Sequence, residues 1–223
     1  MRFLFQGTVN LGKELFSLNK NSKKNNLLHN ALPKGKVNVG FVNGEHVRLN
    51  MALMNGEKIG LPTNLQAPPQ FGLTDFQKKL GLRDELIELS IYIFQETIAR
   101  LANFFTKTTI NIIYIPSPVS SYKIVSSHVQ AKGFMADPYI TETTVAEEKH
   151  IKLCKTVKRF AESNNFSFTN ITKSIRLAAS VEFLHGPLDW DHFNKRGHQV
   201  LSDELVKLFL IKKKGMRMDN CVY

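Results

Sequence analysis

Two short stretches in the first third of the chain, one alternating between apolar and polar or small residues and one continuously apolar, end at tight-turn signals. The alternating run 37–41 is followed by Asn43-Gly44, and the apolar run 51–54 is followed by Asn55-Gly56. Asn-Gly between such segments is the strongest short-range signal for a β-hairpin, because both residues tolerate the positive φ angles of the turn. The pattern therefore predicts a small antiparallel element in this region.

Helical periodicity marks four later segments. The clearest begins at Asp84, which can cap the first amides, and its apolar residues recur every three or four positions. Segments 144–164 and 171–179 follow, and Asn194 is a suitable cap for the last helix. The positions predicted to face a core are Leu86, Ile87, Ile91, Phe94, Ile98, Leu101, Ala102 and Phe105, then Val145, Ile151, Leu153, Cys154, Val157 and Phe160, and finally Val200, Leu201, Leu205, Leu208 and Phe209.

Two apolar runs between these helices are predicted to be strands. Segment 110–115 is continuous, rich in isoleucine and closed by Pro116, which is typical of a strand buried on both faces. A second, shorter strand is expected at 166–168. The order helix, strand, helix, strand, helix predicts a layered α/β unit with parallel strands. Ligands in such sheets bind beyond the carboxyl ends of the strands. We expect the serine-rich loop 117–127 and the loop 189–192 to follow strands and to share that edge.

The remaining segments suggest how the chain is organised. Segment 2–5 is consistent with a short buried strand, 11–18 with a short helix, and 62–72 with a proline-rich connection. We expect three parts. They are an N-terminal segment 1–72 that holds a strand, an Asn/Lys-rich loop and the hairpins, an α/β part 73–211, and a basic tail 212–223.

Composition narrows the class of protein. The chain has 223 residues, of which 43% are hydrophobic and 10% aromatic, as expected for a folded domain or a domain with an extension. No apolar run reaches the roughly 20 residues of a membrane span. Segment 1–11 lacks the pattern of a signal peptide, so a cytoplasmic location is the default expectation. Cys154 and Cys221 offer neither a disulfide framework nor metal-ligand spacing.

The net charge of +11 raises the question of an anionic partner. The charge is concentrated in Lys20, Lys23 and Lys24 and in the C-terminal stretch 212–217. Both stretches are typical of solvated loops or tails, and the alternative is a surface for polyanions. No aromatic motif of the RNA-binding kind accompanies them, so a nucleic-acid partner is not expected.

The most distinctive chemistry lies between Leu188 and His198. Asp189 precedes His192 by three residues, in a loop that opens the last helix. A histidine acts as a general base when one ring nitrogen faces the reacting group and an acceptor holds the other in the right tautomer. Asp189 can supply that acceptor locally. The sequence therefore predicts a His–Asp pair, with the nucleophile still to be identified.

This segment resembles the final conserved block of the SGNH (GDSL-type) hydrolases. In that family an Asp-x-x-His block precedes the last helix of a flavodoxin-like sandwich, and its histidine activates a serine. The resemblance covers 108–209 and includes 184–187 and the strand ending at Pro116. It implies a three-layer sandwich with a parallel sheet and ester hydrolysis or acyl transfer on lipid-like or carbohydrate acyl groups. It also implies that His192 is the base and Asp189 its orienter, with no cofactor.

The sequence departs from the family at the nucleophile. The family's Gly-Asp-Ser block, near the start of the domain, is absent, and Gly7-Thr8-Val9 has neither a serine nor an acid. Segment 3–10 instead matches a later strand that ends in an oxyanion-hole Asn, which gives that role to Asn10. Leu11 stands where the family has an Asp. On this match the chain is expected to be an N-terminally incomplete or inactive relative, with the hairpins as an insertion.

Other interpretations of the same residues remain open. Ser117, Ser120 and Ser121 follow a predicted strand and are local candidates for a nucleophile, although serines in loops more often make turn hydrogen bonds. Asp189, Asp191, His192 and His198 could together hold Zn or Mn, or the two aspartates could simply cap turns. The isolated histidines at 46, 128, 150 and 185 are expected to be surface or core residues. The competing function classes are a non-catalytic α/β binding protein and a basic anion-binding protein.

Overall fold

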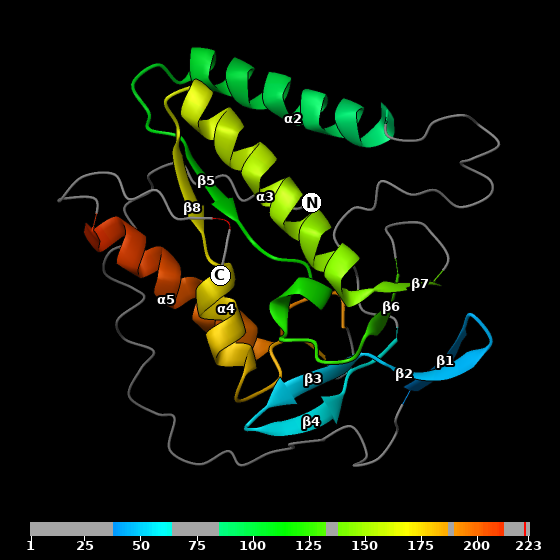
Figure 1. Ribbon diagram of the computed structural model, residues 1–223. Coiled ribbons are helices and arrows are strands. Elements are labelled where there is room, and N and C mark those ends of the chain that lie inside the picture. The colour runs from blue at the N-terminus through cyan, green and yellow to red at the C-terminus, as the bar shows by residue number, and fades with distance from the viewer. Residues whose placement is uncertain (1–37, 64–84, 133–137, 187–189, 212–220, 222–223) are drawn as a thin grey trace, which may run out of the picture.

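The computed structural model describes residues 38–63, 85–132, 138–186, 190–211 and 221 (Figure 1). In this part of the chain the fold is a mixture of helices and small sheets, with antiparallel and parallel strand pairs. The prediction of an α/β protein is therefore confirmed. The predicted strand 2–5, the helix 11–18, Asp84 and the basic tail apart from Cys221 lie outside the described residues.

The first predicted hairpin is confirmed and belongs to a four-stranded sheet. Strands β1 (Asn38–Val42) and β2 (Glu45–Leu49) pair antiparallel around Asn43-Gly44, whose φ angles are 51° and 88°. The sheet continues from β2 to β6 (His128–Lys132), which runs parallel to β2, and then to β7 (Pro138–Glu142), which is antiparallel to β6. The sequence did not predict β6 and β7.

The second predicted hairpin is confirmed as well. Strands β3 (Met51–Met54) and β4 (Glu57–Gly60) pair antiparallel around Asn55-Gly56, with φ angles of 51° and 79° at the turn. Positive φ at both central residues is the geometry that favours Asn-Gly. β3 contributes Ala52 and Met54 to the interior.

A parallel strand pair lies at the centre of the fold. Strand β5 (Asn111–Tyr114) pairs in parallel with β8 (Ser167–Asn170) along its whole length, from Asn111 opposite Ser167 to Tyr114 opposite Asn170. Helix α3 (Thr143–Ser163) lies between the two strands in the sequence. The predicted parallel strands are thereby confirmed. The connection from β5 to α3 also carries a 3-10 turn, η2 (Val119–Ser121), besides β6 and β7.

Residues of β5 enter two hydrophobic clusters, one on each face of the strand. Ile112 and Tyr114 belong to a cluster formed with α3 and helix α2 (Glu85–Phe104). Ile113 packs against the other cluster, which includes residues of η2, β3 and the C-terminal helices. Alternation across a strand places successive side chains on opposite faces, which explains why the residues 112–115 are all apolar.

Helix α2 meets the core along one stripe. Phe94 and Ile98 are buried, and Ile91, Leu101 and Ala102 pack against the same cluster. The sequence placed Phe105 on this stripe, and that position was wrong. Phe105 follows the last helical residue and is 50% exposed, since the chain has already left the helix there.

The last two helices cover the opposite side of the β5–β8 pair (Figure 1). Helix α4 (Thr172–Ala179) packs against α5 (Lys195–Ile211). Val200 and Leu201 of α5 are buried as predicted, and Leu205 packs against them.

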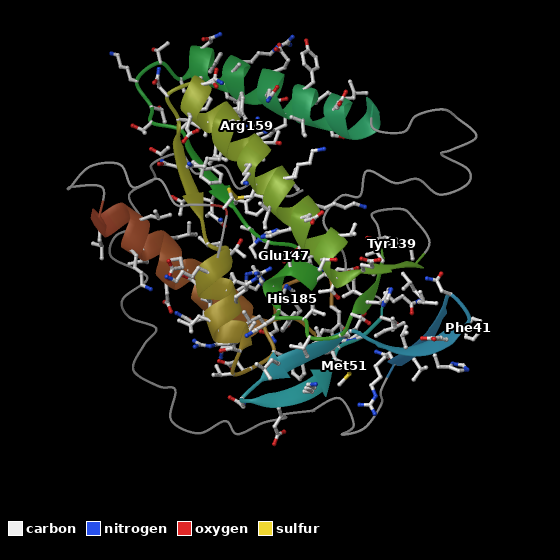
Figure 2. All side chains as sticks on the ribbon, viewed as in Figure 1. Phe41, Met51, Tyr139, Glu147, Arg159 and His185 are labelled. Carbon is white, nitrogen blue, oxygen red and sulfur yellow. A yellow bond between two sulfur atoms is a disulfide. The ribbon has the colours of Figure 1, made fainter. Side chains whose placement is uncertain are left out.

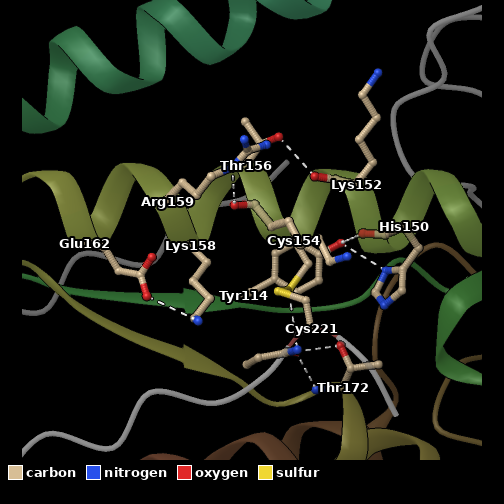
Figure 3. The surroundings of a disulfide bond; sticks show 12 residues. Tyr114, His150, Lys152, Cys154, Thr156, Lys158, Arg159, Glu162, Thr172 and Cys221 are labelled. Carbon is tan, nitrogen blue, oxygen red and sulfur yellow. Dashed lines mark hydrogen bonds and ion pairs between the residues drawn. A yellow bond between two sulfur atoms is a disulfide. The ribbon is translucent and has the colours of Figure 1, made fainter.

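One covalent link joins distant parts of the chain. Cys154 on α3 forms a disulfide with Cys221, 67 positions later, with a Cα–Cα distance of 5.8 Å (Figure 3). The two sulfurs lie in the cluster shared by α2, α3 and β5. No disulfide was expected from the spacing of the two cysteines, and the structure corrects that interpretation by pairing them.

Candidate functional site

The segment that carries the His–Asp motif lies between α4 and α5, and the structure describes it from Trp190 to Asn194; we call this stretch the motif loop. His192 is partly buried, Asp191 is exposed, and Trp190 packs against the hydrophobic cluster that includes residues of η2, β3 and the C-terminal helices. Asp189 and Asn10 lie outside the described residues, so the predicted pair and the oxyanion assignment stay predictions. The expected preceding strand is absent from the described residues. The loop follows α4 instead, and its only pairing there is an isolated bridge between His185 and Phe193.

Asn194 fixes the end of this loop to the start of α5. Its Oδ1 accepts hydrogen bonds from the backbone N–H groups of Arg196 at 2.9 Å and Gly197 at 3.0 Å, so the predicted helix cap is confirmed. Its Nδ2 donates to the carbonyl of Phe183 at 2.9 Å. The backbone N–H of Asn194 donates to the carbonyl of Leu184 at 2.8 Å. One side chain therefore holds both ends of the segment around His192.

Two glycines allow the same segment to pack closely. Gly186 has a φ of 76°, and a Cβ placed there would lie 2.5 Å from the ring of Trp190. A Cβ at Gly197 would lie 2.5 Å from the carbonyl oxygen of Leu184 and 2.6 Å from Phe193. Contacts this short exclude any side chain at these positions without a shift of the loop.

Tyr122 and His185 form a buried pair beneath the loop. The Oη atom of Tyr122 lies 3.0 Å from Nδ1 of His185, and the side chains are 2% and 3% exposed. Burial raises the pKa of Tyr122 to about 12, although hydrogen bonds from the backbone N–H groups of Leu184 and His185 oppose the rise. His185 lies in the interior near α4 and η2 (Figure 2).

The three candidate serines follow β5, as predicted, and form hydrogen bonds with one another. Ser117 Oγ donates to Ser120 Oγ at 3.1 Å, and Ser121 Oγ donates to the carbonyl of Ser117 at 2.9 Å. Ser120 and Ser121 are buried. These contacts are the turn hydrogen bonds that serine makes in loops, and they stabilise η2. None of the hydrogen bonds found for these serines in the described part of the chain reaches His192.

An open cavity of about 480 Å³ lies beside this serine turn. Its apolar wall includes Val119, Tyr122 and Ile124, and its polar wall comes from the first turns of α3 and from α4. There Arg176 donates to Glu147 at 2.6 Å and to the carbonyl of Ser120 at 2.9 Å. Each of these charged side chains has a partner, so the polar wall is held in place by its own contacts. The volume lies within the range of small-molecule sites.

The isolated histidines are surface or core residues, as predicted. His46 is exposed and His128 is partly exposed, whereas His150 and His185 are buried. His150 Nδ1 lies 3.0 Å from the hydroxyl of Tyr114. Burial lowers the pKa of His150 to about 4, because the charged imidazolium loses its hydration; Glu147 opposes this shift and Arg176 adds to it.

Metal binding by the motif segment gains no support in the described part of the chain. His198 is exposed on α5, and Asp189 is not among the described residues. No group of three or more His, Cys, Asp or Glu side chains within the described ranges is arranged to hold an ion.

Sequence reasoning missed the residues that support the motif loop. Tyr122 and His185 lie 63 positions apart in the sequence, and only the fold brings them together. The one available signal was the capping residue Asn194, which the sequence did identify.

Comparison with protein-family models, curated proteins and solved structures finds no match to this chain. None of the helices in the described residues combines the length and apolar character needed to cross a membrane.

Proposed function

We propose that this chain is a divergent relative of the SGNH hydrolases and that His192 and Asp189 are the base and the orienting acid of an ester-cleaving site. The observation that carries the proposal is the arrangement of the motif segment. His192 stands two residues before the cap of α5, in a loop that closely packed glycines and Asn194 hold in one shape. A base on a rigid loop can be presented to a substrate with little loss of orientation.

The architecture supports the relationship. β5, α3 and β8 form a parallel strand–helix–strand unit, with helices α2 and α3 on one side and α4 and α5 on the other. We propose that this unit is part of a three-layer flavodoxin-like sandwich and that the two hairpins are an insertion in it. In such sheets ligands bind at the carboxyl ends of the strands, where the turn 117–121 follows β5.

The proposed chemistry is transfer of an acyl group from an ester. His192 would take the proton of the attacking hydroxyl and return it to the leaving alcohol, and Asp189 would hold the imidazole in the required tautomer. The attacking group is not assigned to a residue, because the turn serines bond to one another. Since a base without its nucleophile loses most of its catalytic advantage, the activity expected of the chain alone is low.

The cavity beside Tyr122 suits the acyl part of such a substrate. Val119, Tyr122 and Ile124 give it an apolar wall, and Ser120 connects it to the turn after β5. Its lining includes two cationic residues, Lys123 and Arg176, and two anionic residues, Glu147 and Glu148, so its formal charge balances. An uncharged acyl group fits this balance better than a free anion does.

Ester hydrolysis by the purified chain tests the proposal. We expect turnover of short-chain p-nitrophenyl esters that falls to the background rate in His192→Ala and persists in His198→Ala, a second histidine nearby on α5. A fluorophosphonate probe applied to the same proteins reports any activated serine. Equal turnover in the wild type and His192→Ala contradicts the proposal. Absence of both turnover and labelling favours the alternative of a non-catalytic binding protein.

A further inference from the structure

The hydroxyl of Tyr122 is the centre of a buried hydrogen-bond cluster. Its Oη lies 3.1 Å from the backbone nitrogen of Leu184, 3.2 Å from that of His185 and 3.0 Å from Nδ1 of the His185 ring. Tyr122 directly follows η2, whereas Leu184 and His185 lie 62 and 63 positions later. The cluster therefore ties the turn after β5 to the segment that leads into the motif.

The donors and acceptors in this cluster determine which nitrogen of the His185 ring carries a hydrogen. A phenol oxygen carries one hydrogen and accepts about two hydrogen bonds. The two backbone N–H groups can only donate, so they occupy the acceptor sites of Tyr122. The remaining hydroxyl hydrogen then points to Nδ1 of His185, which must accept it. His185 consequently carries its own proton on Nε2.

The His185 ring in turn contacts the motif itself. It stacks on Phe193, the residue after His192, with ring centroids 4.8 Å apart and planes tilted by 37°. The backbones of His185 and Phe193 form an antiparallel bridge. A displacement of His185 must therefore move the peptide that carries His192.

We propose that Tyr122 and His185 are positioning residues for His192, acting as a latch that holds the motif loop on the turn after β5. The catalytic consequence of the latch rests on the proposed function. Its structural consequence, a fixed loop with His185 protonated on Nε2, can be measured whether or not the protein cleaves esters.

A second buried Tyr–His pair provides a matched control. Tyr114 Oη also lies 3.0 Å from Nδ1 of a buried histidine, His150. Tyr114 belongs to the hydrophobic cluster formed with α2 and α3. Tyr114→Phe thus removes a hydroxyl that also lies beside a histidine Nδ1, in the cluster formed with α2 and α3. Comparison with Tyr122→Phe separates a local positioning effect from a general loss of core packing.

The single tryptophan of the chain reports on the loop directly. Trp190 packs edge-on against Phe183, with ring centroids 5.4 Å apart. In folded Tyr122→Phe, with folding checked by circular dichroism, we expect Trp190 emission to shift to the red and acrylamide quenching to increase. The ring resonances of His192, followed by NMR at one fixed pH, should also change. Tyr114→Phe should leave these signals as in the wild type. An unaltered Trp190 and His192 in Tyr122→Phe, or equal changes in the two variants, overturns the proposal.

Substitutions of His185 test the direction of the hydrogen bond. In His185→Asn the amide oxygen can accept from Tyr122 in place of Nδ1, whereas His185→Leu has no acceptor. We expect the Trp190 emission of His185→Asn to resemble the wild type and that of His185→Leu to shift. In the wild type, ¹⁵N spectra should show His185 protonated on Nε2. A proton on Nδ1, or indistinguishable Asn and Leu variants, contradicts the latch.

Activity measurements distinguish the proposed ester-cleaving function from the proposed positioning role of Tyr122 and His185. If the wild type cleaves esters, Tyr122→Phe should lower kcat by up to about 100-fold with little change in KM, because a misplaced base loses orientation but not substrate binding. An unchanged kcat overturns the positioning role. If the wild type is inactive, the proposed function fails, and the spectroscopic comparison alone decides whether the latch exists.

Discussion

The hydroxyl of Tyr114 at the end of β5 lies 3.0 Å from Nδ1 of His150 on α3, inside the protein (Figure 3). His150 is fully buried, and burial lowers its pKa to about 4, so the ring is neutral in the folded protein at neutral pH. The pair links the central strand to the helix that covers it, so its protonation state bears on the stability of the whole unit.

Stability should therefore fall as the pH drops from 6.5 towards 4. In this range the unfolded chain binds a proton at His150 and the folded chain does not, so acid favours unfolding. The shift from 6.5 to about 4 corresponds to a loss of about 3 kcal/mol. Urea unfolding at a series of pH values checks this. Above pH 6.5 the contribution of His150 should be constant.

His150→Gln isolates that contribution. Carboxylates elsewhere in the chain affect both proteins alike, so the difference between the two pH profiles belongs to His150. We expect the variant to be less dependent on pH between 6.5 and 4, whatever its stability at neutral pH. Parallel profiles for the two proteins contradict the prediction.

The Cys154–Cys221 disulfide should contribute substantially to stability. It joins positions 67 residues apart, and closing a loop of this length restricts the unfolded chain by about 4 kcal/mol. Reduction with dithiothreitol should lower the urea midpoint of the wild type. The double variant Cys154→Ala/Cys221→Ala should be less stable than the oxidised protein and insensitive to reductant. An equal midpoint with and without reductant in the wild type would show that the bond is absent or has little effect.

The elements that the sequence predicted are those determined by local periodicity. The hairpins around Asn43-Gly44 and Asn55-Gly56 follow from the φ angles of their turns. Helices α2, α3 and α5 follow from apolar residues at helical spacing. Strand β6 escaped prediction because its inward residues, Val129 and Ala131, make an alternation too short to recognise. Its pairing with β2 and β7 depends on contacts that only the folded chain makes.

The candidate site was predictable only in part. The motif, its loop and the cap at Asn194 can be read from one continuous segment. The support beneath it comes from the contact between Tyr122 and His185, which are 63 positions apart, and nothing in the sequence links these two residues. The disulfide was missed for the same reason, since Cys221 lies far from the helix that holds Cys154.

Asn194 should stabilise the motif loop through both ends of its side chain. Asn194→Ala removes the acceptor for two helix amides and the donor to the Phe183 carbonyl, and we expect a loss of about 2 kcal/mol in the free energy of unfolding. Asn194→Ser keeps a capping oxygen and loses only the donor, so its loss should be intermediate. Urea unfolding followed by Trp190 fluorescence measures both. Equal stability of the Ala and Ser variants would mean that the cap contributes nothing.

At Gly197, close packing and helix propensity predict opposite signs for the change in the free energy of unfolding on substitution by alanine. It is the third residue of α5, and replacing a glycine by alanine within a helix ordinarily adds up to about 1 kcal/mol of stability. Here the new Cβ would lie 2.5 Å from the carbonyl oxygen of Leu184, so the loop or the helix must move. We expect Gly197→Ala to destabilise the protein by about 1 to 3 kcal/mol and to alter Trp190 emission. Ser202→Ala, on the exposed side of the same helix, is the control and should be neutral or slightly stabilising. A gain in stability for Gly197→Ala would show that the start of α5 is not held against the segment before the motif.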